Sequence, residues 1–155
     1  MKGKELNRAI ITISLVGVLV STYALYVELL ADLRPGYKAM CDISEHASCS
    51  KVLTSKYAKG LGLVPEGSPF KVPNCVYGII FYCIIIFLTT YDHLMAVRLQ
   101  LGLSAMSLVI CVYLAYLLIF ILKDFCVVCV STYVVNIANT FLIKKKHTYV
   151  MTKNK

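Results

Sequence analysis

Residues 125–143 read FCVVCVSTYVVNIANTFLI, a run that contains no charged side chain and carries two cysteines near its start. A hydrocarbon core about 30 Å thick is crossed by roughly 20 helical residues. One lysine or aspartate at mid-bilayer costs about 2.5–3.5 kcal/mol on insertion scales, so charge-free runs of this length are informative. The stretch therefore predicts a membrane-spanning helix with a pair of thiols at one end.

Three further runs have the same character and predict spans over residues 9–30, 75–91 and 99–122, the first of them free of charge as far as residue 27. Inside lipid the backbone must satisfy its own hydrogen bonds, and runs this long do so as helices. We therefore expect an all-α integral membrane protein, a four-transmembrane-helix bundle that forms a single domain over residues 1–155.

The overall composition favours lipid over water as the surroundings. Hydrophobic residues make up 59% of the chain and the mean hydropathy is +0.74, whereas soluble proteins contain about 45–50% apolar residues. The formal net charge of +8 would suit nucleic acid, but the basic residues gather at the two ends and in one loop. A chain this apolar is not expected to bind nucleic acid.

The distribution of lysine and arginine predicts the orientation. Both ends of the chain are basic, and four spans place both ends on one side, so both termini are expected in the cytoplasm. The loop over residues 31–74 then lies on the opposite side. Within it, Leu53, Tyr57 and Leu61 recur every four residues, which predicts a short helix over residues 50–63 that anchors the loop on the membrane surface.

Cys126 and Cys129 stand at the start of the fourth predicted span. Two thiols at positions i and i+3 of a helix share one face and can close into a disulfide. The positive end of a helix stabilises a thiolate, which is the reactive form of cysteine. The pattern favours redox chemistry, with two buried small hydrophobic residues or half of a zinc site as the alternatives.

Cys41 and Cys49 lie on the polar part of the loop, at the membrane face that the predicted orientation gives to Cys126 and Cys129. A loop thiolate can attack a disulfide at the membrane edge and carry electrons inward, so the two pairs predict a relay. A single structural disulfide is the main alternative. A zinc site built from all four cysteines is disfavoured by their irregular spacing, and no metal is expected. The remaining cysteines are expected to be simply buried: Cys75, Cys83 and Cys111.

A relay that ends inside the bilayer needs an acceptor that dissolves there, and quinones are apolar two-electron acceptors of this kind. Tyr133 follows Cys129 by four residues on the same helix stripe, and its hydroxyl can donate to a carbonyl oxygen. Asn74 stands at the start of the second span on the same side, where its amide can donate to the opposite carbonyl. An interfacial tyrosine and a helix N-cap are the ordinary interpretations of these two residues.

Several segments of the chain resemble the vitamin K epoxide reductase family in residue type, order and spacing. They are Cys41-Asp42-Ile43, Ser48-Cys49-Ser50-Lys51-Val52, Asn74 with Tyr77-Gly78 and Phe81-Tyr82, and Asp124-Phe125-Cys126-Val127-Val128-Cys129-Val130-Ser131-Thr132-Tyr133. The likeness runs from about residue 9 to residue 143. The chain departs from some relatives in containing no tryptophan, with Tyr57 at a position where they carry one.

The resemblance implies a role for each redox cysteine. Cys129 would attack the quinone or epoxide, and Cys126 would be its partner, which exchanges with Cys49 on the loop. Cys41 would be the outer thiol that meets a reducing partner. A luminal thioredoxin-fold protein is the expected partner, because the resemblance covers no fused domain of that kind.

The resemblance also implies a substrate pocket. Asn74 and Tyr133 would bind the two ketone oxygens, and Phe81 would form a wall of the pocket. Coumarin-type inhibitors are expected to bind there too. No tightly bound cofactor is expected, because vitamin K quinone or its epoxide is itself the substrate.

The expected function is thiol-dependent reduction of vitamin K epoxide and vitamin K quinone in the endoplasmic reticulum membrane, whose lumen is oxidising. A disulfide-forming oxidase that passes electrons to ubiquinone or menaquinone would use the same residues. A non-catalytic four-span scaffold protein would explain the apolar spans and a loop disulfide. It would not explain a CxxC motif at a helix start on the same side of the membrane.

Overall fold

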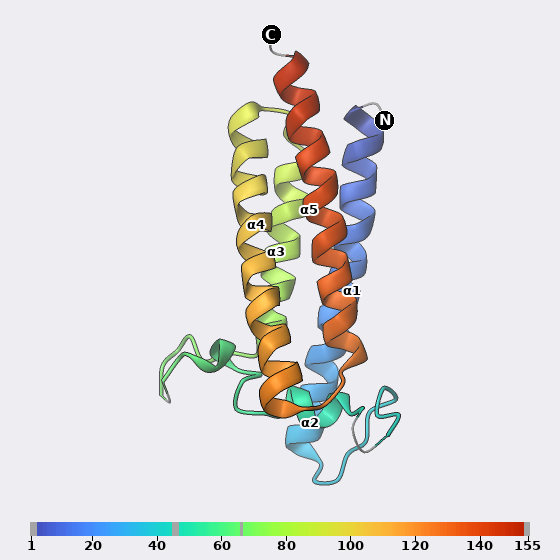
Figure 1. The fold of residues 1–155 in the computed structure, drawn as a ribbon, viewed down its shortest axis with the longest axis vertical. Helices are drawn as coiled ribbons and strands as arrows, with labels where there is room; N and C mark the ends of the chain where they lie inside the picture. Colours follow the sequence, from blue (N-terminus) through green and yellow to red (C-terminus); the bar gives the residue numbers. More distant parts are fainter. Residues whose placement is uncertain (1–2, 45–46, 66, 154–155) are drawn as a thin grey trace.

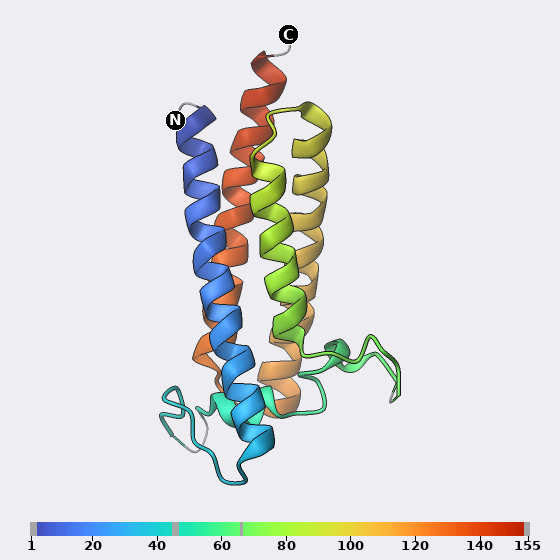
Figure 2. The ribbon, with the colours of Figure 1, turned by 180° about the vertical axis from the view of Figure 1, so that it is seen from behind.

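The computed structural model describes residues 3–44, 47–65 and 67–153, and its long helices run side by side as a bundle (Figure 1, Figure 2). The helical elements are α1 (Gly3–Leu33), α2 (Cys49–Leu53), η1 (Gly60–Gly62), α3 (Asn74–Thr89), α4 (Leu94–Tyr116), η2 (Leu117–Leu122) and α5 (Val127–Lys153). The described residues form no β-strand, only two isolated bridges. The start of α1 and the end of α5 lie at one end of the bundle, and the segment between α1 and α3 lies at the other.

Three helical stretches are long and apolar enough to cross a membrane: Gly3–Leu33, Leu94–Leu122 and Val127–Lys153. The fourth, α3, is also apolar but has 16 residues, or about 24 Å of helix. Large apolar side chains such as Leu19, Val112 and Phe141 are exposed on the sides of the bundle, as expected for surfaces that face lipid. The predicted all-helical, multi-pass membrane bundle is therefore confirmed, with three long spans and one shorter apolar helix.

The helices differ from the predicted spans mainly at their ends. α1 extends beyond residues 9–30 at both ends, and α5 starts at Val127 and extends beyond residue 143, because the polar residues that flank the apolar runs continue each helix. α3 starts at Asn74, one residue before the predicted residue 75 and directly after Pro73, where the fixed φ of proline suits a helix start. α4 starts five residues before the predicted residue 99, at Leu94, and is capped by the side chain of His93.

Small and polar side chains hold α1, α3 and α5 together. Gly17 lies so close to the ring of Tyr82 that a Cβ placed there would stand 2.5 Å from Cζ of the ring. Ser14 exchanges hydrogen bonds with Asn139, and Tyr82 donates to Asn136 at 3.0 Å. Such close approaches and interhelical hydrogen bonds associate helices in lipid, where burial of apolar surface provides little driving force.

One buried lysine joins three helices at the end of the bundle away from the loop. Lys146 of α5 is 1% exposed, and its Nζ donates to the carbonyls of Thr89 at 2.9 Å and Tyr91 at 3.2 Å. The same Nζ lies 3.3 Å from Oδ1 of Asp92, which also accepts from Asn7 of α1. Carbonyls at the C-terminus of α3 that have no partner within the helix thus receive a donor.

The loop does not contain the single surface helix predicted over residues 50–63. α2 ends at Leu53, and the chain then pairs with the stretch before α3 through an isolated antiparallel bridge between Lys59 and Pro73. Gly60 has a φ of +59° and donates its N–H across this pairing at 2.9 Å. A helix cannot continue through that conformation. We call residues 49–63 the cap, because they lie across the end of the bundle.

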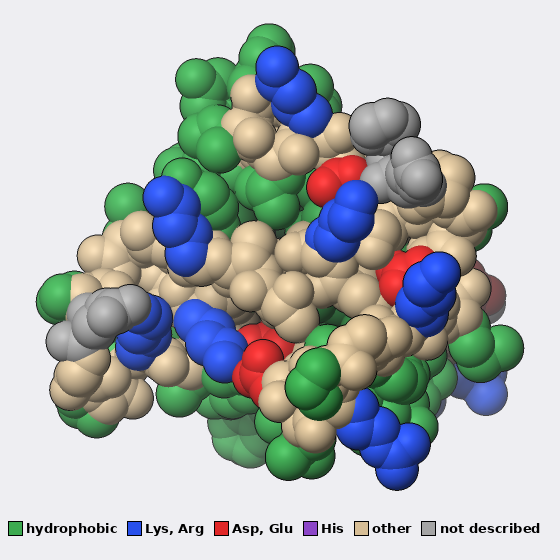
Figure 3. All heavy atoms as spheres, turned by 90° about the horizontal axis from the view of Figure 1, so that it is seen from below, with side chains coloured by type: hydrophobic (Ala, Val, Ile, Leu, Met, Phe, Trp, Pro, Cys, Tyr) green, Lys and Arg blue, Asp and Glu red, His purple; other side chains and the backbone are tan. Residues whose placement is uncertain are grey.

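The face at the loop end is polar (Figure 3). Lysine and arginine side chains are spread over it, with a few acidic side chains between them, and apolar side chains gather toward its edges. This end of the bundle therefore suits contact with water, in contrast to the apolar sides.

Candidate active site

Cys126 stands immediately before the first residue of α5 and caps that helix. Its Sγ accepts a hydrogen bond from the N–H of Cys129 at 3.4 Å, and its carbonyl accepts from Val130 at 3.0 Å. Cys126 is fully buried, Cys129 is half-buried, and both thiols are free. The backbone N–H groups at a helix start favour a negatively charged sulfur at this position.

The loop cysteines form the disulfide Cys41–Cys49, with Cα atoms 5.8 Å apart, within the usual range for a disulfide. Cys49 is the first residue of α2 and is fully buried, whereas Cys41 is half-buried and lies 3.9 Å from the hydroxyl of Tyr23. The inner sulfur of this pair therefore faces the bundle, and the outer sulfur is closer to solvent.

The carboxylate of Asp42 joins the two arms of this disulfide loop. Its oxygens accept hydrogen bonds from Ala39 N, Ser48 Oγ and both the N–H and the hydroxyl of Ser50, at 2.6–3.0 Å. Burial by itself raises the pKa of Asp42, but the hydrogen bonds from Ser50, Ala39 and Ser48 outweigh it and hold the pKa below its usual value. Asp42 therefore stays ionised at neutral pH.

Residue types and spacing also make this loop resemble a metal site. One oxygen of Asp42 and the sulfurs of Cys41 and Cys49 lie within 4.8 Å of one another. The two sulfurs are bonded to each other and the carboxylate already accepts four hydrogen bonds. A thiolate is the form of cysteine that binds zinc, so this donor set does not fit a metal ion while the disulfide is closed.

The two cysteine pairs meet at one end of the bundle. Cys49 and Cys126, both 0% exposed, belong to the same apolar cluster, which also contains Val27 and Leu118. Cys41, Cys129 and Tyr133 pack against that cluster. A loop sulfur and a helix-start sulfur are thus buried in one environment, as a relay between the two pairs requires.

An apolar cavity of about 140 Å³ opens beside Cys129. Asn74, the first residue of α3, and Tyr133, one turn beyond Cys129 on α5, line the same cavity. The other walls are mostly aliphatic and include Ala24, Val52, Leu53, Leu114, Leu117 and Leu118. Cys126 does not line it, so Cys129 is the thiol of the pair that faces this space.

Phe81 lines a second cavity next to the first. This second cavity, of about 360 Å³, lies between α3, α4 and α5 and shares Asn74, Gly78 and Tyr133 with the smaller one. The structure therefore brings Asn74, Tyr133 and Cys129 together and places Phe81 in the adjoining space. The two cavities share walls, which suits a ligand with a compact head and a long apolar part.

The side chain of Asn74 binds the cap, a contact that the sequence did not predict. Its Nδ2 donates to the carbonyl of Tyr57 and its Oδ1 accepts from the N–H of Leu61, both at 2.7 Å. The ordinary interpretation of Asn74 as a helix N-cap is wrong, because Pro73 holds that position. Asn74 instead holds the cap over the cavity, and Tyr57 lines the cavity instead of facing the membrane surface. The second N–H of the amide donates to no residue within the described ranges and is free to bind a ligand.

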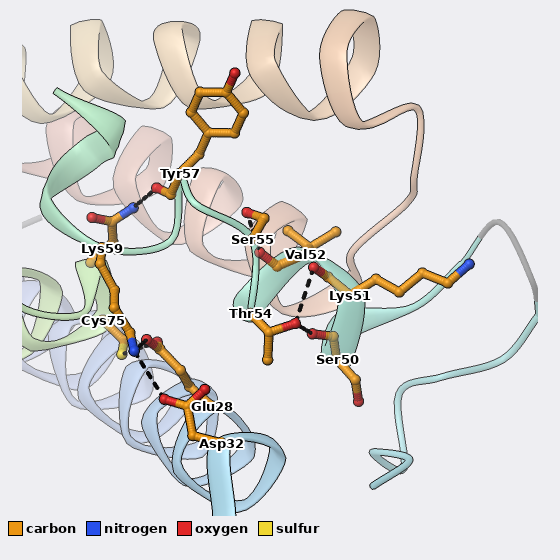
Figure 4. Close-up of polar contacts among 11 residues, drawn as sticks. Glu28, Asp32, Ser50, Lys51, Val52, Thr54, Ser55, Tyr57, Lys59 and Cys75 are labelled. Carbon is orange, nitrogen blue, oxygen red and sulfur yellow. Dashed lines mark hydrogen bonds and ion pairs between the residues drawn. The ribbon is translucent and has the colours of Figure 1, made fainter. Parts of the chain in front are cut away.

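Sequence reasoning also missed Glu28, the single charged residue of the first predicted span. Its carboxyl group is 1% exposed and accepts from the thiol of Cys75 at 3.7 Å. Figure 4 shows Glu28 and Cys75 beside Lys59 and Asp32, where α1, α3 and the cap meet. Cys75 lines the smaller cavity, so its predicted simple burial is incomplete, and Cys83 is exposed instead of buried.

Comparison with known proteins agrees with this geometry. The model of the vitamin K epoxide reductase family matches residues 8–143, a range that holds both cysteine pairs, Asn74 and Tyr133. Vitamin K epoxide reductase complex subunit 1 of Mus musculus is 34% identical over 140 residues, which are 88% of this chain and 87% of the mouse protein. The protein of that name from Rattus norvegicus is 35% identical over 134 residues, which are 84% of this chain and 83% of the rat protein.

Proposed function

Because this chain belongs to the vitamin K epoxide reductase family and is thus an oxidoreductase, we propose that it reduces vitamin K epoxide and vitamin K quinone with electrons from thiols. The observation that carries the proposal is the apolar cavity lined by Cys129, Asn74 and Tyr133. A thiol and two hydrogen-bond donors around an apolar space are what the reduction of a membrane-soluble diketone requires.

In the proposed reaction, the Cys129 thiolate attacks a ring carbon of the epoxide while Asn74 and Tyr133 donate hydrogen bonds to the two ketone oxygens. A sulfur–carbon bond forms and the carbon–oxygen bond of the epoxide breaks. Cys126 then attacks the Cys129 sulfur, the sulfur–carbon bond breaks, and the oxygen leaves as water. The two electrons come from the thiol pair, which becomes a disulfide, and the two thiol protons balance the water formed.

The electrons are replaced through the loop. In the proposed relay, a Cys49 thiolate attacks the sulfur of Cys126, and Cys41 resolves the mixed disulfide to restore the inner thiols. The burial of Cys49 and Cys126 in one cluster supports this exchange. A luminal thioredoxin-fold protein then reduces the Cys41–Cys49 disulfide, and the greater exposure of Cys41 supports its role as the contact sulfur.

We place the enzyme in the endoplasmic reticulum membrane with both termini in the cytoplasm and the cap in the lumen. Basic residues at both ends of the chain support this orientation, as does the position of both ends at one end of the bundle. The oxidising lumen suits the loop disulfide. Coumarin-type inhibitors are proposed to occupy the cavity of Cys129, and no tightly bound cofactor is part of the scheme.

The test is turnover of vitamin K epoxide by detergent-purified protein. Cys129→Ala is expected to abolish turnover with dithiothreitol, because the attacking sulfur is lost. Cys41→Ala is expected to spare turnover with dithiothreitol and to reduce turnover driven by a thioredoxin-fold partner. Cys83→Ala, on an exposed face of α3 away from both cavities, is the matched control and should behave as the unmodified protein. Normal turnover in Cys129→Ala would contradict the scheme.

The choice of acceptor is tested in the same assay. Vitamin K epoxide, vitamin K quinone, ubiquinone and menaquinone are offered separately to the reduced protein. Reduction of the epoxide supports the proposal. Reduction of ubiquinone or menaquinone without any turnover of the epoxide would instead identify a disulfide-forming oxidase.

A further inference from the structure

One buried carboxyl group beside the cavity has no part in the scheme above. Glu28 is 1% exposed, and among the described residues its Oε1 has no hydrogen-bond partner. The nearest cation, the Nζ of Lys59, lies 3.9 Å from that oxygen but only 2.9 Å from Oδ2 of Asp32. Burying a carboxyl group with only a weak partner destabilises the folded protein. This cost suggests that Glu28 is retained for a function.

Cys75 connects this carboxyl group to the substrate site. Its thiol donates to Oε2 of Glu28 at 3.7 Å. The same residue lines the cavity that holds Cys129 and Asn74. The other oxygen of Glu28, Oε1, lies 3.9 Å from the Nζ of Lys59, whose side chain is 38% exposed. The carboxyl group of Glu28 therefore contacts a partly exposed side chain through Oε1 and the cavity-lining Cys75 through Oε2, and Figure 4 shows these residues together.

The hydrogen bond between Glu28 and Cys75 can run in either direction. An ionised carboxylate only accepts, so the S–H then points at Glu28. A protonated carboxyl group donates its O–H to the sulfur, and the S–H is then free to point into the cavity. The groups that face Glu28 are Cys75 of α3, Lys59 of the cap and Asp32 of α1. The hydrogen bond with Asp32 raises the pKa of Lys59, so this lysine stays charged throughout.

We propose that Glu28 holds the proton that Cys75 delivers to the epoxide oxygen, a role that rests on the proposed reductase function. As the bond between Cys129 sulfur and carbon forms and the carbon–oxygen bond breaks, the oxygen takes the S–H proton of Cys75. The Cys75 sulfur takes the carboxyl proton of Glu28 in the same step. No electron passes through Cys75. Glu28 then regains a proton from bulk solvent, which the partly exposed Lys59 side chain reaches. This proton balances the one that Cys129 gives up to solvent when its thiol ionises.

The first test is a single turnover of pre-reduced protein mixed with vitamin K epoxide over a range of pH. Only protonated Glu28 can donate, so the rate should fall on the alkaline side. Glu28→Gln has the same size but no proton to give. This variant is expected to lower the single-turnover rate on the order of 10²-fold. Its rate should also no longer decline at alkaline pH. Asp32→Asn removes the closer partner of Lys59 and leaves the Glu28–Cys75 contact. The rate of this variant should still decline at alkaline pH.

The second test separates proton transfer from packing. Cys75→Ser keeps a group that both donates and accepts, and it should retain the alkaline fall. Cys75→Ala should lose the fall as Glu28→Gln does, and Cys83→Ala on the same helix should be unaffected. If Glu28→Gln does not fold, the contrast between the serine and alanine variants at Cys75 still decides the question.

The outcomes distinguish the two proposals. Unmodified protein that does not turn over the epoxide contradicts the reductase function itself. Active unmodified protein, together with Glu28→Gln and Cys75→Ala variants that match it in rate and in pH dependence, overturns the proton relay and leaves the reductase function standing.

Discussion

At the scale of the residue, Asp42 determines the pH range over which the disulfide loop keeps its shape. The carboxylate accepts four hydrogen bonds that lower its pKa, with burial acting in the opposite direction. A pKa lowered by folding means that the stabilisation is complete above the usual pKa of about 3.9 and is lost as the pH falls through the folded value. Neutral and mildly acidic conditions should therefore leave the loop intact.

We predict that the N–H groups of Ala39 and Ser50, which both donate to Asp42, keep constant protection from hydrogen exchange between pH 7 and about pH 4. Below that range the protection should decline. Asp42→Asn should weaken the protection at every pH, on the order of 10-fold, because hydrogen bonds to a charged group contribute about 1.5–3 kcal/mol. Exchange in the unmodified protein that accelerates between pH 7 and pH 5, after correction for the intrinsic rate, would contradict this role.

At the scale of the element, the junction at Lys146 is expected to hold α5 to the end of α3. Lys146→Met keeps the apolar stem and removes the donor for the carbonyls of Thr89 and Tyr91. An unpaired buried carbonyl such as that of Thr89 costs about 1–3 kcal/mol, so the midpoint of thermal unfolding in detergent should fall. Lys144→Met, on an exposed position one half-turn away, is the control. Equal midpoints for the two variants would show that the junction is not stabilising.

The sequence predicts the four apolar helices well but does not predict the conformation of the cap. The four apolar helices follow from hydropathy, because lipid forces an apolar chain to satisfy its backbone locally. The cap does not, because the bridge between Lys59 and Pro73 is a long-range contact that no local spacing encodes. The four-residue recurrence of Leu53, Tyr57 and Leu61 therefore predicted a helix that tertiary pairing prevents.

At the scale of the whole molecule, the orientation is open to a direct test. Epitope tags at both termini should be accessible to antibody in cells whose plasma membrane alone has been permeabilised. A tag inserted at Gly67, where an added Cβ would meet no heavy atom within 4 Å, should become accessible only after the internal membranes are also opened. The opposite pattern would place the cap, and with it the loop disulfide, in the cytoplasm.

The position of the two cysteine pairs at the same end of the bundle could be predicted from the number of spans, since an even number of crossings returns the loop and the CxxC motif to the same face. The contact between Glu28 and Cys75 could not, because it depends on the rotation of α1 against α3. That rotation is set by close approaches such as Gly17 against Tyr82. Side-chain contacts between helices need the packed bundle, whereas the side of the membrane needs only the order of the spans.

Two hydrogen bonds join the side chain of Asn74 to the cap, so this residue would link substrate binding to closure of the cavity. The amide that the scheme assigns to a ketone oxygen also fastens Tyr57 and Leu61 over the cavity. In the proposed scheme, one side chain would therefore both recognise the substrate and keep bulk water out of the cavity. Under the same scheme, loosening the Asn74 amide would expose both the bound ligand and the Cys129 sulfur to water at once.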